Sequence, residues 1–182
     1  MSARPLAEPL SVYLNDHLTG AFGGAALAHR MADTHPDSRR AAELRRLARD
    51  VEQDRDDLVR IMNSLAVPVR HYRTWLGLAG ERIARLKPNG TLVRRSPLSD
   101  LIELEAMRVG VEGKTALWQA LRAIADDDPR LNPDELDRLI QRAAEQTRTL
   151  NGWHQVVSAE VLTGEGGTAG GTAGADSGTL PR

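Results

Sequence analysis

The sequence predicts an all-α protein built as a bundle of long helices. Apolar residues recur at spacings of three and four along most of the chain, and no stretch alternates β-branched and polar residues as a strand does. Helix-breaking stretches divide the chain into five helical segments. With 182 residues, the chain has the size of one domain with a sizeable core. We expect a helical domain over residues 10–162, preceded by an extension at 1–9 and followed by a tail at 163–182.

The first two predicted helices, residues 10–33 and 38–65, form a hairpin. Only the short turn THPD separates them, and so short a connection makes successive helices antiparallel neighbours. Gly20, Gly23 and Gly24 lie in the first helix. Because each glycine costs up to about 1 kcal/mol relative to alanine in a helix, we expect them to allow close packing against a neighbouring helix, with a local distortion of the helix as the alternative.

A shorter helix over residues 68–86 is predicted to link the hairpin to the second half of the chain. Pro68 fits the first turn of a helix, and the stretch KPNG ends the segment. The apolar residues of this segment fall on one face, which is typical of a helix that caps or joins a bundle.

Two further long helices are predicted at residues 97–125 and 133–162. Ser96 before Pro97 and Asn132 before Pro133 are typical N-cap and first-turn pairs. The stretch DDDP ends the first of these helices. The tail that follows the second is rich in glycine and has too few apolar residues to order itself, so we expect it to be disordered.

Composition excludes several classes of function. The 24 basic and 25 acidic residues give a net charge of -1, so there is no overall basic field for nucleic acid. No cysteine is present, which excludes thiolate chemistry. The first residues lack the continuous apolar run of a signal peptide or membrane anchor, so we expect a cytoplasmic protein. Motifs for a serine hydrolase, a phosphate-binding loop or a zinc protease are missing.

Charged residues fall within the apolar faces of two predicted helices. Glu105 and Glu112 are one heptad apart near the centre of an apolar arc, with Arg108 between them. Arg55 projects into the stripe of the second helix. A lone buried carboxylate costs several kcal/mol, so we expect Arg55, Glu105, Arg108 and Glu112 to form a buried ion-pair network that fixes the helix register. The acidic neighbours of Arg55, namely Asp54, Asp56 and Asp57, are predicted to lie on a solvated helix face.

The order of the helices resembles the ferritin-like four-helix bundle, in which a crossover, here 66–95, links two antiparallel hairpins. The resemblance covers residues 10–162. More narrowly, YLNDHL at 13–18, VEQDRDDL at 51–58 and RSPLSDLIELEAMRVGVEGK at 95–114 are similar to an uncharacterised bacterial group of that superfamily. That group brings no established activity.

The diiron members of the superfamily carry Glu-x-x-His on two of their helices. Here Glu52 and Glu105 are followed three residues later by Arg55 and Arg108, and a guanidinium neutralises carboxylates but cannot bind a metal ion. This departure favours a degenerate, metal-free core without a cofactor.

An alternative stays open, in which the bundle binds iron or manganese. Its candidate ligands are His17, Glu52, Glu105, Glu112 and His154. In that case the resemblance implies a di-metal carboxylate oxidoreductase or a protein of iron handling or oxidative stress.

The favoured function is therefore non-enzymatic: a structural or interaction protein. The three tryptophans are expected in the core, and an exposed one would indicate the interface of a homodimer. The glycine-rich tail ending in DSGTLPR is similar to the targeting tails of ferritin-like cargo proteins of encapsulin shells, although a disordered terminus is the simpler interpretation.

Overall fold

The computed structural model describes residues 8–70 and 97–163, and within them every regular element is an α-helix. The helices are α1 (Glu8–Thr34), α2 (Ser38–Ser64), α4 (Pro97–Ile124) and α5 (Pro133–Thr163). The prediction of an all-α protein is confirmed, and each of the four long helices begins and ends within two residues of its predicted bounds. The linking helix at 68–86, with Trp75, and the glycine-rich tail lie outside the described residues.

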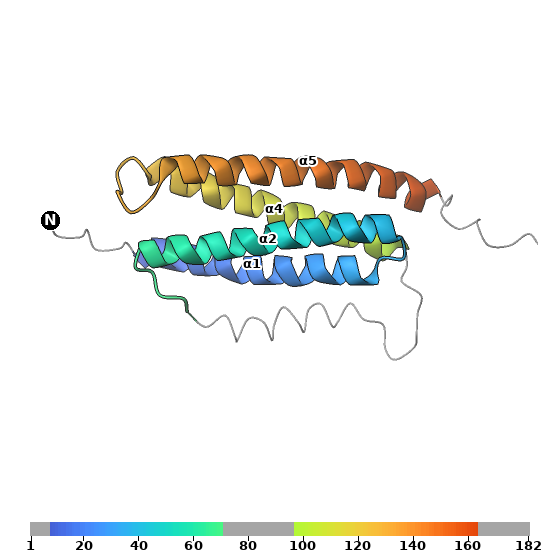
Figure 1. Ribbon diagram of the computed structural model, residues 1–182, viewed down its shortest axis with the longest axis horizontal. Helices are drawn as coiled ribbons and strands as arrows, with labels where there is room; N and C mark the ends of the chain where they lie inside the picture. The colour runs from blue at the N-terminus through green and yellow to red at the C-terminus, as the bar shows by residue number, and fades with distance from the viewer. Residues whose placement is uncertain (1–7, 71–96, 164–182) are drawn as a thin grey trace, which may run out of the picture.

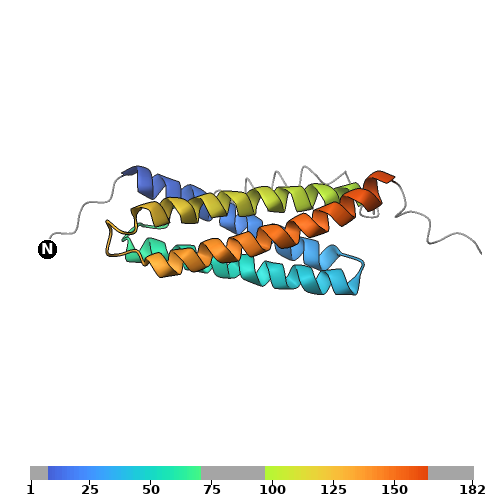
Figure 2. The same cartoon turned by 90° about the horizontal axis from the view of Figure 1, so that it is seen from above.

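Two helical hairpins lie against each other in an elongated bundle (Figure 1). The chain reverses direction between α1 and α2 and again between α4 and α5. α2 ends at one end of the bundle and α4 begins at the other, so α4 runs opposite to α1. Seen from above, α1 passes diagonally behind α4, and these two helices make the closest contact between the hairpins (Figure 2).

Local signals at the helix ends explain where the helices begin. Asp37 caps α2, because its side chain accepts a hydrogen bond from the Arg39 backbone N–H at 2.9 Å. Asn132 caps α5 in the same way, since its Oδ1 accepts a bond from the Glu135 N–H at 3.2 Å, as its position before Pro133 predicts.

A tight turn ends α2 and directs the chain back toward α1. Ala66 has a φ of 56°, in the left-handed region, and its N–H bonds to the carbonyl of Asn63 while that of Val67 bonds to Met62. This pair of bonds is the Schellman motif. Val67 is buried by the turn, and Asn15 of α1 accepts a hydrogen bond from the Arg70 N–H at 2.7 Å. Residues 67–70 therefore lie against the N-terminal half of α1.

The core consists of two apolar clusters, one toward each end of the bundle. The first contains Leu14 and Leu18 of α1 with Leu58, Trp118 and other residues of the remaining helices. The second contains residues such as Ala28 and Leu44 of the first hairpin with residues of the second. Trp118 is buried, and Trp153 packs against the second cluster, as expected of core tryptophans. Among the described residues, no helix combines the length and apolar character needed to cross a membrane.

Candidate functional site

The two apolar clusters are separated by a layer in the middle of the bundle where the apolar pattern changes. In each helix, core positions alternate at spacings of three and four, which is the heptad pattern of packed helices. At the middle position of its series, each of α2, α4 and α5 has a polar side chain that is buried or largely buried. α1 has an alanine there. These residues are Ala21 of α1, Asp54 of α2, Lys114 of α4 and Gln146 of α5.

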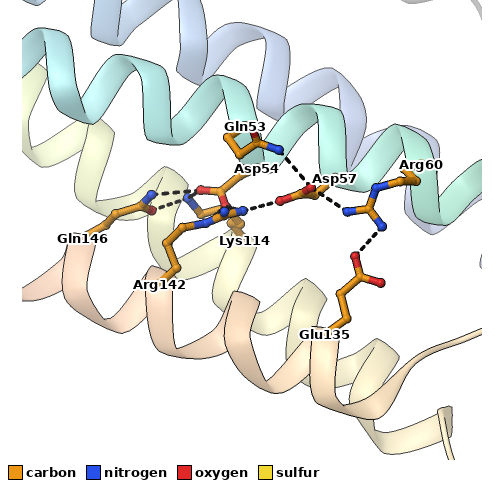
Figure 3. A network of polar contacts seen from close by, with 8 residues as sticks. All are labelled: Gln53, Asp54, Asp57, Arg60, Lys114, Glu135, Arg142 and Gln146. Carbon is orange, nitrogen blue, oxygen red and sulfur yellow. Dashed lines mark hydrogen bonds and ion pairs between the residues drawn. The ribbon is translucent and has the colours of Figure 1, made fainter.

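The Asp54 carboxylate lies at the centre of this layer and is 2 % exposed. Its Oδ2 atom accepts hydrogen bonds from the Lys114 ammonium and, at 2.9 Å, from Gln146 Nε2. Its Oδ1 atom accepts a bond of 2.7 Å from Arg142 Nε. Lys114 also donates to Gln146 Oε1 (Figure 3). Asp54 belongs to the first hairpin, and both of its carboxylate oxygens thus accept hydrogen bonds from side chains of the second hairpin.

Asp57, one turn further along α2, extends the same network toward the bundle surface. Arg142 bonds to Asp57 Oδ2, so one guanidinium joins both aspartates. Arg60 and Gln53 donate to Asp57 Oδ1 at 2.6 and 3.1 Å, and Arg60 also pairs with Glu135 of α5 (Figure 3). We call Asp54, Asp57, Lys114, Arg142 and Gln146 the polar layer. Its two carboxylates and two cations balance in charge.

Burial and pairing shift the protonation of the polar layer. Burial raises the pKa of Asp57, but hydrogen bonds from Arg142, Arg60 and Gln53 outweigh burial and hold that pKa below its ordinary value of 3.8. Burial lowers the pKa of Lys114 below its ordinary value, and the neighbouring Asp54 carboxylate offsets only part of this effect. Burial also lowers the pKa of Arg142, yet its bonds to the two aspartates raise it overall, so Arg142 stays charged.

A cavity of about 310 Å³ opens beside the polar layer, on the side of α1. Val51 and Asp54 of α2 lie in its wall together with Lys114 and Trp118 of α4. α1 contributes no large apolar side chain to it. The residues from α1 are Asp16, His17, Gly20, Ala21 and Gly24. The middle layer is therefore polar toward α5 and hollow toward α1.

The glycines of α1 do not serve the close packing that we expected of them. A Cβ atom added at Gly20 or Gly23 would meet no atom of the described residues within 4 Å, and one at Gly24 would make only ordinary contact with Val51 at 3.8 Å. Gly20 and Gly24 line the cavity, as do Gly110 and Gly113 of α4, where an added Cβ would also meet nothing. These glycines widen a space between α1 and α4 instead of bringing the helices together.

The predicted network of Arg55, Glu105, Arg108 and Glu112 is wrong. Glu105 and Glu112 are exposed. In the part of the chain that the structure describes, no ion pair joins either glutamate to Arg55 or Arg108. Arg55 instead bonds to its exposed neighbour Asp56 at 2.8 Å and lies 5.4 Å from the centre of the Phe22 ring. Asp54 and Asp57, expected on a solvated face, are the buried carboxylates.

The five candidate metal ligands do not come together. His154 Nε2 lies 3.2 Å from Glu105 Oε1, whereas Glu52 pairs with His29 at 3.1 Å. His17 lies in the cavity wall with its ring against Tyr13. Glu112 is 3.5 Å from the hydroxyl of Thr147. Within residues 8–70 and 97–163, no group of three or more histidine, aspartate or glutamate side chains has the arrangement of a metal site.

The polar layer carries a sequence signal that the projection of separate helices missed. The heptad positions of α2 are Leu44, Leu47, Val51, Asp54, Leu58 and Ile61, and Leu65 at its C-cap continues the series. Asp54 therefore interrupts an otherwise apolar series once, at its middle. Lys114 interrupts the series in α4, and Gln146 that in α5, in the same way. A single polar residue at the same level of three helices predicts a shared buried network.

Comparison with protein-family models, with curated proteins and with solved structures gives no match for this chain.

Proposed function

We propose that this protein is a non-enzymatic structural or interaction protein of ferritin-like type, whose two hairpins are held in register by the polar layer. The observation that carries the proposal is the state of Asp54. Both of its oxygens accept hydrogen bonds from cationic side chains of the other hairpin. A metal ion at this carboxylate would have to displace an ammonium and a guanidinium, and a guanidinium cannot itself become a ligand.

The direction of the helices supports the ferritin-like part of the proposal. α2 ends and α4 begins at opposite ends of the bundle (Figure 1). A connection along the length of the bundle is the feature that distinguishes ferritin-like proteins from bundles with short loops throughout. In this proposal residues 66–95 supply that crossover.

The metal content of the purified full chain tests the proposal against the metal-binding alternative. The protein would be incubated with ferrous iron or manganese, freed of excess metal and analysed by mass spectrometry. We expect no stoichiometric metal in the wild type and no change in the Asp54→Asn variant. One or two metal ions per chain, lost on Asp54→Asn, would overturn the proposal.

A second candidate function, metal binding at another place, rests on the His154–Glu105 pair. The imidazole and carboxylate lie 3.2 Å apart, and the two side chains are 25 % and 53 % exposed, so a cation can reach them. The same measurement distinguishes this candidate, because its metal would be lost in His154→Ala and retained in Asp54→Asn.

The interaction part of the proposal rests on an exposed apolar stripe on α4. Leu98, Ile102 and Val109 share one face of the helix and are 50 %, 48 % and 73 % exposed. The exposed Glu105 lies between Ile102 and Val109 on this face, so the stripe is a group of apolar side chains around one carboxylate. Exposed apolar residues that gather on one face indicate a contact surface more often than scattered ones do. We assign this stripe to a second copy of the chain, because a stripe along a single helix can pair with itself across a twofold axis.

A further inference from the structure

The cavity beside the polar layer has the properties of a small-molecule site. Ligand pockets have volumes of about 300 Å³ upward and apolar walls with a few polar groups. The cavity here measures about 310 Å³, and Val51, Leu58, Met107, Val111, Leu117 and Trp118 supply its apolar wall. An engineered cavity of about 150 Å³ holds benzene, so about twice that volume suits a molecule with two rings.

The sequence keeps this space open at a cost to the helices. Four glycines line the cavity, namely Gly20, Gly24, Gly110 and Gly113. Alanine would fit at each of these positions without a clash. Since each glycine weakens a helix by about 1 kcal/mol relative to alanine, packing within residues 8–70 and 97–163 does not explain these glycines. A ligand that needs the space would explain them.

The wall offers a hydrogen-bond donor that the polar layer leaves over. Lys114 has three N–H groups, and its bonds to Asp54 and Gln146 use two of them. Lys114 lies in the wall of the cavity, so a ligand oxygen could accept a bond from its remaining N–H group. The Trp118 Nε1–H also has no hydrogen-bond partner among the described residues, but this atom is fully buried, so an occupant of the cavity does not reach it.

The charges around the cavity select against an ionised ligand. Asp54 and Asp57 balance Lys114 and Arg142, and Asp16 in the wall adds a negative charge. A carboxylate or phosphate entering the cavity would therefore find no spare cation among the described residues that line it. His17 in the wall is half-buried. Burial lowers its pKa and outweighs the opposing effect of Asp16, so His17 adds no positive charge to the cavity at neutral pH.

From these observations we infer that the cavity binds an uncharged, largely apolar molecule of about two rings, whose carbonyl oxygen accepts a hydrogen bond from Lys114. This site is independent of the proposed contact surface on α4. It uses the space that α1 leaves in the middle layer.

Binding of the uncharged fluorescent naphthyl ketone Prodan to the full chain tests the inference. We expect saturable binding of one molecule per chain, with emission shifted to the blue. Gly113→Leu, which puts a side chain into the cavity, should weaken binding by at least about tenfold. The control is Gly152→Leu in α5, the same change at a helical glycine that does not line the cavity, which should leave binding unchanged. Because leucine is the better helix former, both variants should melt no lower than the wild type.

A matched probe and a further variant locate the binding site. Replacement of the carbonyl group of Prodan by a methylene, in 6-propyl-2-dimethylaminonaphthalene, should weaken binding to the wild type about fivefold, the value of one hydrogen bond. Val109→Asp on the exposed stripe should not affect either probe. The inference is overturned if the wild type shows no saturable binding, if Gly113→Leu binds like the wild type, or if Val109→Asp abolishes binding.

Discussion

Asp54 and Glu105 show how burial decides what a carboxylate does for the fold. Asp54 is 2 % exposed and neutralises Lys114 and Arg142, whereas the side chain of Glu105 is 53 % exposed and contacts His154. Removing the Asp54 carboxylate leaves the buried Lys114 ammonium without its anionic partner and Arg142 with Asp57 alone. Removing that of Glu105 leaves a histidine that water can solvate.

We therefore predict that Asp54→Ala lowers the free energy of unfolding by about 3 to 5 kcal/mol, as loss of one member of a buried ion pair does. Glu105→Ala should change it by no more than about 0.5 kcal/mol, as expected for an exposed pair. Urea unfolding followed by circular dichroism measures both. Equal effects of the two substitutions would show that the polar layer is not buried in solution.

Asp57 should make stability depend on pH in the acid range. Its pKa in the folded protein is below the ordinary value of 3.8, because bonds from Arg142, Arg60 and Gln53 outweigh the effect of burial. The ionised group therefore stabilises the fold above pH 3.8, and this contribution is lost as the pH falls through the folded-state pKa.

Comparison of the wild type with Asp57→Asn isolates this effect. We expect the difference in their unfolding free energies to be constant near neutral pH and to shrink as the pH is lowered below 3.8, where Asp57 of the wild type also becomes neutral. Asp56→Asn, at an adjacent and exposed position, is the control and should produce a small difference throughout. A difference for Asp57→Asn that stayed constant into strong acid would contradict the assignment.

At the scale of the helix, α4 explains why the site was predicted in the wrong place. Its core face includes Leu101, Leu104 and Val111, but Leu98 and Val109 form a second, exposed apolar stripe. When both stripes are projected onto one helical wheel, the centre of the combined apolar arc lies near Glu105 and Glu112. Local periodicity cannot tell an apolar residue that faces the core from one that faces outward, because the difference lies in the neighbouring helices.

The ends of the helices were predictable because their signals are local. Asn132 before Pro133 caps α5 through its own side chain, so a short stretch of sequence contains the whole cause. The left-handed residue Ala66 at the end of α2 was not predictable in this way, since glycine is the usual residue there.

Ala66→Gly should accordingly stabilise the protein by about 0.5 to 1 kcal/mol, because glycine adopts a positive φ without the steric cost of a Cβ atom. The matched control is Ala42→Gly at an exposed position inside α2, which should destabilise by about 1 kcal/mol. Thermal melts of both variants measure the two shifts. Destabilisation by Ala66→Gly would mean that the turn has a different backbone conformation in solution.

At the scale of the whole molecule, the bundle is organised in three levels along its length. Two apolar clusters hold the ends, and the middle contains the polar layer and the cavity. The four helices and their order can be predicted from the spacing of apolar residues and from the helix-breaking stretches. The hydrogen-bond partners of Asp54, Lys114 and Gln146 cannot be predicted in this way. They depend on which turns of α2, α4 and α5 lie side by side, and the packing of all four helices determines this.

The assignment of the α4 stripe predicts self-association of the whole chain. Sedimentation velocity should show a dimer of the wild type and a monomer of Val109→Asp, because the variant replaces the most exposed apolar side chain of the stripe by a second carboxylate beside Glu105, which opposes burial of this face. Val156→Asp introduces the same change at another exposed valine, on α5, and should remain dimeric. A monomeric wild type would refute the assignment, as would dimers of Val109→Asp.

The most direct test of the central claim is the coupling energy between Asp54 and Lys114, which join the two hairpins. It is obtained from the unfolding free energies of the wild type, Asp54→Ala, Lys114→Met and the double variant. If the ammonium and carboxylate are paired in the middle of the bundle, the double variant should be more stable than the sum of the single effects implies, by about 1 kcal/mol or more. Effects that add to within about 0.3 kcal/mol would mean that the two side chains do not interact, and the polar layer would then not hold the hairpins together.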